Sequence, residues 1–185
     1  MFIPTGIPGL LLYEPVVFGD ERGYFYELYN EQTFTAGNVH CRFVQDNQAL
    51  SGYGVVRGLH FQKGEHAQTK LVRALRGSIL DVVVDLRVGS PAFGKSYAVE
   101  LSEENKLQLL VPKGFAHGYS VISPTAEVLY KCDTFYHKAS EGGLAFDDPS
   151  LGINWRIPRD KMILSEKDKL NPPLAGCGNI FSYIP

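Results

Sequence analysis

Two β-rich runs near the middle of the chain decide its fold: Gly54-Val55-Val56-Arg57-Gly58-Leu59-His60-Phe61-Gln62 and, after a short polar bridge, Gln68-Thr69-Lys70-Leu71-Val72. They place an arginine, a histidine and a lysine on two strands that follow each other along the chain. A buried ionisable side chain without a partner is strongly unfavourable, so a core strand rarely carries one unless it serves a ligand. We therefore interpret the two runs as strands that build a binding or catalytic site.

Length and composition favour one compact unit. The chain has 185 residues, 44% of them hydrophobic, and a formal net charge of −2. These values suffice for one sizeable core, so we expect residues 1–185 to form a single domain. The weak net charge gives no overall field for attracting nucleic acid or an anionic membrane, and we expect neither as a partner. Any phosphate group must be bound by locally placed cations.

The three cysteines, Cys41, Cys132 and Cys177, have neither metal-ligand nor redox-type spacing. An odd number without such spacing argues against a disulfide framework and for a reducing compartment. Residues 1–12 include an apolar stretch but no basic leader and no small-residue cleavage site. No run reaches the roughly 18 apolar residues of a membrane-spanning helix. We expect a cytoplasmic protein.

Short β-rich runs separated by glycine and proline indicate an all-β sandwich or barrel. Only residues 31–36 and 161–169 have a helical pattern, and the proline-rich segment after Asp147 is expected to wrap the barrel. The expected strands are 10–18, 25–29, 42–49, 54–62, 69–75, 78–86, 95–101, 106–111, 117–122 and 126–136.

The alternation of side chains along residues 54–62 raises one difficulty. Arg57 and His60 have opposite parity, and successive side chains of a regular strand point to opposite faces. Both side chains reach one cavity only if the strand bulges between them or if each contacts the cavity at a different depth. Gly58 is a natural position for such a bulge.

Two segments are similar to the halves of the cupin motif, which in metal-binding members supplies two histidines and a glutamate, then a third histidine. His60 has the spacing of the first histidine, and His117, after Pro112-Lys113-Gly114-Phe115-Ala116, has that of the third. Gln62 occupies the position of the second, and Glu65 is out of step. Two nitrogen ligands fall short of the three protein ligands that a catalytic metal usually has, so we predict no metal.

The chain as a whole resembles the dTDP-4-dehydrorhamnose 3,5-epimerase family, a group of metal-free cupins. The matching segments, in order, are 20–27, 45–47, 57–62, 70–72, 77–87, 89–90, 93–94, 114–118, 130–131, Tyr136 and 148–149. The resemblance implies a cupin-type double-stranded β-helix, or jelly roll, with a few short and mainly C-terminal helices. It also implies an isomerase without cofactor that inverts C3 and C5 of dTDP-4-dehydro-6-deoxy-D-glucose. The product, dTDP-4-dehydro-L-rhamnose, feeds dTDP-rhamnose and cell-surface polysaccharide biosynthesis, including the lipopolysaccharide O-antigen.

Inversion of a carbon beside a ketone needs a base, a group that stabilises the enolate oxygen, and an acid on the opposite face. We expect His60 to be the base, because an imidazole ordinarily titrates near pH ~6.5. The resemblance adds Asp168 as the partner that fixes its tautomer. It also implies Lys70, aided by His117, as the enolate stabiliser and Tyr130 as the acid.

The resemblance further implies a set of contacts to the nucleotide and the sugar. Arginine matches diphosphate oxygens, amide side chains match base or hydroxyl edges, and aromatic rings stack on bases. The role of Asp81 stays open. The expected substrate-binding residues are Arg22, Phe25, Glu27, Gln45, Asn47, Arg57, His117, Tyr136, Glu141 and Lys167.

Family members are homodimers that exchange N-terminal strands, so we expect Arg22 and Glu27 to complete the site of a neighbouring subunit. Three other functions stay open from the residues alone. The first is a single-site epimerase that inverts only C3 or only C5. The second is a protein that binds a sugar nucleotide without catalysis. The third is a metal-dependent cupin isomerase or dioxygenase. The spacing of Gly52, Gly54 and Gly58 is no dinucleotide fingerprint, and we expect no nicotinamide cofactor.

Overall fold

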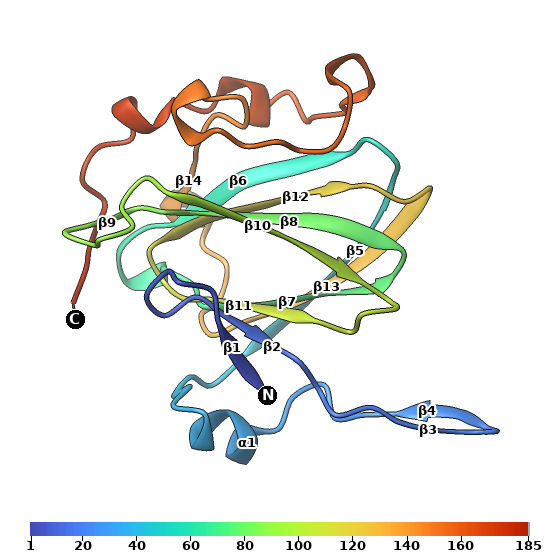
Figure 1. Ribbon diagram of the computed structural model, residues 1–185. Helices are drawn as coiled ribbons and strands as arrows, with labels where there is room; N and C mark the ends of the chain where they lie inside the picture. Colours follow the sequence, from blue (N-terminus) through green and yellow to red (C-terminus); the bar gives the residue numbers. More distant parts are fainter. Residues whose placement is uncertain (185) are drawn as a thin grey trace.

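Two facing antiparallel β-sheets form the body of the protein (Figure 1). A computed structural model describes residues 1–184. The larger sheet has the order β1-β2-β11-β7-β13-β5, and the smaller has the order β10-β8-β12-β6-β14. The strands of these sheets are β1 (Phe2–Pro4), β2 (Leu11–Tyr13), β5 (Gln45–Gly52), β6 (Val56–Gln62), β7 (Lys70–Arg76), β8 (Ser78–Asp85), β10 (Ser96–Ser102), β11 (Gln108–Val111), β12 (Phe115–Val121), β13 (Thr125–Cys132) and β14 (Glu141–Gly143). The prediction of an all-β fold is confirmed.

The core lies between the sheets, and a second apolar layer lies outside the smaller one. Val83 faces the space between the sheets and packs with Val72 and Val128. Its neighbours Val82 and Val84 face the other way, into a cluster that includes Leu151 and Trp155. The segment after residue 144 therefore covers the outer face of the smaller sheet, where it is drawn in orange and red in Figure 1. Because β8 is buried on both faces, Val82, Val83 and Val84 are apolar in succession instead of alternating with polar residues.

The outer face of the larger sheet is covered by the short helix α1 (Glu31–Ala36). Asn30 caps this helix by accepting hydrogen bonds from the backbone N–H groups of Gln32 and Thr33. Phe34, fully buried, packs against Leu71 and other apolar side chains of the sheet. The helix predicted for residues 31–36 is confirmed.

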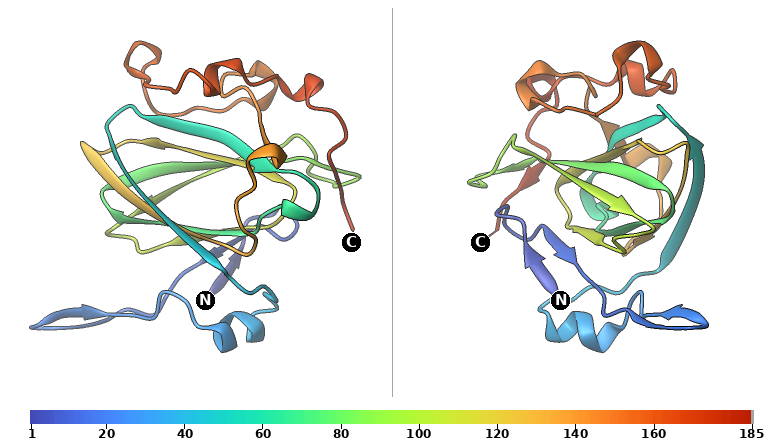
Figure 2. Two further views of the ribbon diagram at one scale, coloured as in Figure 1. Left: turned by 180° about the vertical axis from the view of Figure 1, so that it is seen from behind. Right: turned by 45° about the vertical axis from the view of Figure 1, so that its right-hand side comes forward.

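A hairpin of β3 (Phe18–Asp20) and β4 (Gly23–Phe25) extends away from the body, as both views in Figure 2 and the view in Figure 1 show. Every residue of its two strands is exposed, including Phe18 and Phe25. We call residues 16–27 the arm.

The C-terminal segment is less helical than its sequence pattern indicates. Residues 161–169 were expected to form a helix, and this prediction is wrong: the segment contains only 3-10 turns at Arg159–Lys161 and Asp168–Leu170. Further turns lie at Gly64–His66, Lys138–Ser140, Pro149–Leu151 and Leu174–Gly176, and β9 (Arg87–Val88) pairs with β15 (Phe181–Ser182). The strand expected at 25–29 ends at Phe25. Within residues 1–184, no helix is both long and apolar enough to cross a membrane.

Candidate active site

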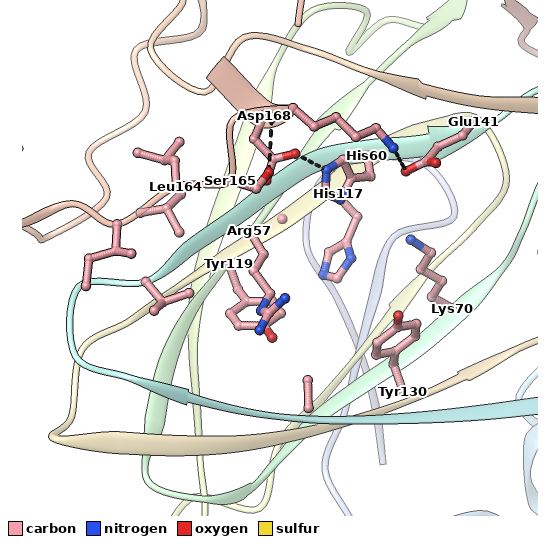
Figure 3. A pocket seen from close by; sticks show the side chains of 16 residues that line it. Arg57, His60, Lys70, His117, Tyr119, Tyr130, Glu141, Leu164, Ser165 and Asp168 are labelled. Carbon is pink, nitrogen blue, oxygen red and sulfur yellow. Dashed lines mark hydrogen bonds and ion pairs between the residues drawn. The ribbon is translucent and has the colours of Figure 1, made fainter. Parts of the chain in front are cut away.

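A cavity of ≈ 520 Å³ opens between the two sheets, with the C-terminal segment as its roof (Figure 3). This volume falls in the range of small-molecule sites, about 300–1,000 Å³. Its walls come from β6, β7, β12 and β13, and Leu164, Ser165 and Asp168 close it from above. Of the expected site residues, the cavity is lined by Arg57, His60, Lys70, His117, Tyr130, Glu141, Lys167 and Asp168.

A bulge in β6 brings Arg57 and His60 into this one cavity. In the pairing of β6 with β12, His60 lies opposite His117 and Arg57 lies opposite Tyr119, so Gly58 and Leu59 together face Gly118. Gly58 has a φ of +115°, a left-handed conformation that favours glycine. A β-carbon on Gly58 would lie 2.6 Å from the Cα of Gly118, so the two backbones approach too closely for a larger residue. The bulge expected at Gly58 is confirmed.

His60 is oriented by a buried carboxylate from the roof. Its Nε2 lies 2.6 Å from Oδ1 of Asp168, whose other oxygen accepts the Gly58 backbone N–H at 3.4 Å. Burial raises the pKa of Asp168, but the hydrogen bonds from His60, Gly58 and Ser165 and the charge of His60 outweigh it, and the pKa is lowered. Asp168 is therefore ionised and only accepts hydrogen bonds at neutral pH. Nε2 of His60 must carry the proton, which leaves Nδ1 of the neutral ring as a base.

A second histidine–carboxylate pair lies behind the first. Nε2 of His117 donates to Oδ1 of Asp81 at 2.6 Å, and both side chains are buried. Asp81 faces His117 from the neighbouring strand, because His117 on β12 lies opposite Val83 of β8 and Asp81 lies one pleat further along. The cavity thus contains two imidazoles, each held by its own carboxylate.

Lys70 and Tyr130 form the opposite wall, on neighbouring strands of the larger sheet (Figure 3). Nζ of Lys70 lies 5.7 Å from the centre of the Tyr130 ring. Burial lowers the pKa of the Lys70 amine. Burial is also the largest cause of the rise in the pKa of Tyr130 to about 12, so this phenol is protonated and able to donate at neutral pH.

A side pocket of ≈ 140 Å³ adjoins the cavity and shares His60, Lys70 and Tyr130 with it. Glu141 is also common to both, and the other lining residues of the side pocket include Gln45, Asn47, Gln62, Gln68 and Tyr136. Nε2 of Gln45 donates to Oδ1 of Asn47 at 3.0 Å, and Oε1 of Gln45 accepts the Tyr136 backbone N–H at the same distance. The amides and the half-exposed Tyr136 ring therefore form one connected polar surface with an aromatic edge.

Glu141 connects the side pocket to the roof. It pairs with Nζ of Lys167 at 2.5 Å and accepts a hydrogen bond from the Tyr136 hydroxyl at 2.9 Å. Burial raises the pKa of Glu141, but Lys167 and Tyr136 outweigh it, so the pKa is lowered. Glu141 and Lys167 thus bridge β14 and the C-terminal segment across the mouth of the cavity.

Arg57 is anchored by a hydroxyl instead of a carboxylate. Its Nε and Nη2 both donate to Oγ of Ser51, at 3.2 and 3.1 Å. Within residues 1–184 these are the only side-chain hydrogen bonds of Arg57. Its guanidinium keeps further N–H groups for a ligand.

The structure places three of the expected contacts elsewhere. Arg22, Phe25 and Glu27 belong to the arm and line neither the cavity nor the side pocket of their own chain. Arg22 instead pairs with Asp20 of the same hairpin. Stacking of Phe25 on the base stays a prediction, and within one chain the ring lies outside both pockets.

Other residues enter the site without having been predicted. Ser51, Tyr119 and Ser165 escaped notice because no motif marks them, and Asp81 had no visible partner before the order of the strands was known. Gln62, at the position of a cupin metal ligand, accepts the His137 backbone N–H at 2.7 Å. In the described part of the chain, no three His, Cys, Asp or Glu side chains are grouped so as to hold a metal ion.

Comparison with known proteins decides the family. Residues 4–176 match the family described as dTDP-4-dehydrorhamnose 3,5-epimerase. The Salmonella typhimurium enzyme of that name is 50% identical over 177 residues, which cover 93% of this chain and 94% of the relative. The chain belongs to the dTDP-4-dehydrorhamnose 3,5-epimerase family.

Solved structures of this epimerase family share the fold. The dTDP-4-dehydrorhamnose 3,5-epimerase of Elizabethkingia anophelis is 54% identical, with a TM-score of 0.93 over 97% of this chain and 98% of that one. The Legionella pneumophila dTDP-6-deoxy-D-glucose-3,5-epimerase, in complex with dTDP-4-keto-L-rhamnose, is 42% identical, with a TM-score of 0.95 over 100% and 99% of the two chains. The predicted cupin fold is confirmed. The chain is an isomerase with the 3,5-epimerase activity of this family, a step in dTDP-rhamnose biosynthesis.

Proposed function

We propose that the cavity inverts C3 and then C5 of dTDP-4-dehydro-6-deoxy-D-glucose by removing and returning protons through an enolate. The observation that carries the proposal is the arrangement of the cavity: a carboxylate-bound imidazole on one wall faces a lysine and a protonated phenol on the other. The ligand of the Legionella relative, dTDP-4-keto-L-rhamnose, is the expected product and supports the same substrate class.

His60 is the proposed base. The Asp168 carboxylate holds its Nε2–H, so the lone pair of Nδ1 is free to take the proton of the carbon next to the ketone. As positive charge develops on the imidazole, the buried carboxylate stabilises it. The reaction needs no redox partner, because the inverted carbon has the same oxidation state in the substrate and in the product.

Lys70 and His117 are proposed to stabilise the enolate oxygen. A cation and an N–H donor fixed before the reaction stabilise the developing negative charge without reorganisation. Asp81 holds His117 through Nε2, so Nδ1 is the ring atom that remains to contact the enolate oxygen. This assigns Asp81 the role of orienting that imidazole.

Tyr130 is proposed to return a proton to the face opposite His60. The two residues line the cavity from different sheets, as inversion requires. Its raised pKa, about 12, keeps the phenol protonated before the reaction. The nearby Lys70 ammonium lowers the cost of forming the phenolate.

The nucleotide is proposed to occupy the side pocket and the mouth of the cavity. Gln45 and Asn47 offer amide edges to the base or to hydroxyl groups, and Tyr136 offers a stacking surface. Arg57 and Lys167 supply cationic contacts for the diphosphate.

The arm is proposed to pack on a second copy of the chain. A two-stranded hairpin is marginally stable by itself, and Phe18, Tyr24 and Phe25 are each more than 60% exposed here. A homodimer with exchanged arms covers these side chains and brings Arg22 and Glu27 to the cavity of the partner. A monomer in size-exclusion chromatography with light scattering would contradict the exchange. The cytoplasmic location stays a prediction.

Turnover of the keto sugar in D₂O tests the proposed chemistry. Deuterium at both C3 and C5 is expected, and His60→Asn is expected to slow incorporation at least ~10²-fold. Deuterium at C3 alone identifies a single-site epimerase, and tight binding without any exchange identifies a sugar-nucleotide binding protein. Loss of activity on addition of a chelator, together with stoichiometric metal in the protein, identifies a metal-dependent cupin.

A further inference from the structure

The part of the cavity around Arg57 contains a buried hydroxyl that the proposed mechanism does not use. Tyr119 on β12 lines the cavity and is 4% exposed. Its hydroxyl oxygen is inaccessible to solvent and has no hydrogen-bond partner within residues 1–184. A buried hydroxyl without a partner costs about 1–3 kcal/mol, so it is expected to have a partner in the working state of the protein.

The Tyr119 hydroxyl lies near one cation, Arg57, and near two oxygen-bearing side chains, Ser51 and Asp81. Tyr119 lies opposite Arg57 in the pairing of β12 with β6, and Figure 3 shows the ring beside the guanidinium. Burial raises the pKa of Tyr119, only partly opposed by the Arg57 charge, so the hydroxyl is protonated and able to donate. Two acceptors lie near this hydroxyl, and each already accepts from another side chain: Oγ of Ser51 accepts two N–H groups of Arg57, and Oδ1 of Asp81, opposite Tyr119 in the pairing of β12 with β8, accepts from His117.

We propose that Tyr119 is a further substrate-binding residue, whose hydroxyl donates together with the Arg57 guanidinium to an oxygen of the bound sugar nucleotide. The oxygen belongs to the hexose or to the phosphate attached to it. Tyr119 lies two residues along β12 from His117 and on the same face of the strand, roughly 7 Å away along the backbone. That spacing brings the hydroxyl close to a hexose whose ketone oxygen meets His117 and whose reacting carbons lie between His60 and Tyr130. The inference rests on the proposed function.

Arg57 is able to make room for this contact. It is an exposed arginine with no carboxylate partner in residues 1–184, and only the Ser51 hydroxyl holds it. Hydrogen bonds made by a charged guanidinium contribute about 1.5–3 kcal/mol, and the Ser51 hydroxyl is a neutral acceptor, so a sugar oxygen replaces it at comparable strength and an anionic phosphate oxygen binds more strongly. Movement of Arg57 toward the ligand also gives the Tyr119 hydroxyl access to the same oxygen.

The test is Tyr119→Phe, measured by KM for the keto sugar nucleotide and by calorimetric Kd for dTDP. A rise in KM of roughly 2- to 12-fold is expected if the accepting oxygen is neutral, and roughly 10- to 150-fold if it is charged. If Kd for dTDP rises as well, the oxygen is on the phosphate; if only KM rises, it is on the hexose. Tyr97→Phe, which removes a partly buried hydroxyl outside the cavity, is the matched control and is expected to change neither value.

Stability separates this role from a structural one. Because the hydroxyl has no partner in the ligand-free protein, Tyr119→Phe is expected to melt at or above the wild-type temperature. The effects of Tyr119→Phe and Arg57→Ala on ligand affinity are expected to be non-additive, because both side chains contact one oxygen. Unchanged KM and Kd overturn the inference, with or without a lower melting temperature. Wild-type protein that neither binds dTDP nor turns over the keto sugar contradicts the proposed function instead.

Discussion

Replacement of Asp168 by asparagine is expected to disable the base while leaving the shape of the site almost unchanged. The asparagine amide has two orientations. If its NH₂ group faces Nε2 of His60, the ring must accept there, and the proton moves to Nδ1, where the base is needed. If its oxygen faces Nε2, the NH₂ group meets the Gly58 backbone N–H, which now donates to the Asp168 carboxylate at 3.4 Å. One orientation removes the base, and the other puts two donors against each other.

The size of the effect follows from this choice. Because the wrong tautomer cannot take the proton, the loss approaches that of the base itself, about 10²- to 10⁴-fold. At about 1.36 kcal/mol per factor of ten, this is roughly 2.7–5.5 kcal/mol of transition-state stabilisation. Asp168→Ala is the informative control. It opens space beside the cavity for a water that accepts from Nε2, so the productive tautomer survives and the loss is expected to be smaller than for asparagine.

The assay is the decay of the C3 and C5 proton signals of the keto sugar in D₂O, followed by NMR. It reports proton removal directly, whichever step limits turnover. Exchange by Asp168→Asn within about threefold of wild type would refute the assignment of His60 as a base oriented by Asp168. The pKa of Asp168 is lowered in the fold, so its contribution to stability is present above its ordinary value near ~3.9 and is lost as the pH falls through the lowered one. Assays near pH 7 therefore compare a wild-type protein whose Asp168 is fully ionised with variants that have a neutral side chain at this position.

Three further outcomes are expected. An equal mixture of Arg22→Ala and His60→Asn chains, unfolded and refolded together, should recover about one quarter of wild-type activity. Half of the randomly formed dimers are mixed, and each mixed dimer has one intact site. No recovery of activity would show that the arm contributes to the site of its own subunit. Burial lowers the pKa of Lys70, so its ammonium is lost as the pH rises through a value below ~10.5, and kcat should fall there. Lys70→Arg should abolish that alkaline limb in the kcat profile, because guanidinium stays protonated. Gly118→Ala should lower the free energy of unfolding by about 1–3 kcal/mol in urea titrations, because the new β-carbon lies 2.5 Å from the Arg57 carbonyl oxygen.

Much of the fold was predictable because it depends on local patterns. Alternating apolar residues located most strands, and the helical pattern of residues 31–36 located the one α-helix in the described chain. Residues 161–169 misled because their mixture of charged and apolar residues fits a helical period, whereas here the segment folds into turns. Packing of the C-terminal segment against the sheet overrode a weak local preference.

The residues of the candidate site were predictable only where a local motif marks them. Residues within one strand or one motif, such as His60 and Lys70, were predictable, because the motif also determines the strand that carries them. Asp81 was not, since its partner His117 comes from a strand that is distant in sequence and next to it only in the folded sheet. Tyr119 and Ser51 escaped because no motif marks them.

The bulge at Gly58 depends both on the local sequence and on the pairing of strands that are distant in sequence. Parity along residues 54–62 separated Arg57 from His60, and glycine between them was the only local sign of how the separation could be removed. The fold removes it by setting two residues of β6 against the single Gly118 of β12. A side chain at either glycine would push these backbones apart, so the pairing of Arg57 with Tyr119 and of His60 with His117 depends on both. The chain thus uses one irregularity of pairing to join a cation and a base that a regular strand would place on opposite faces.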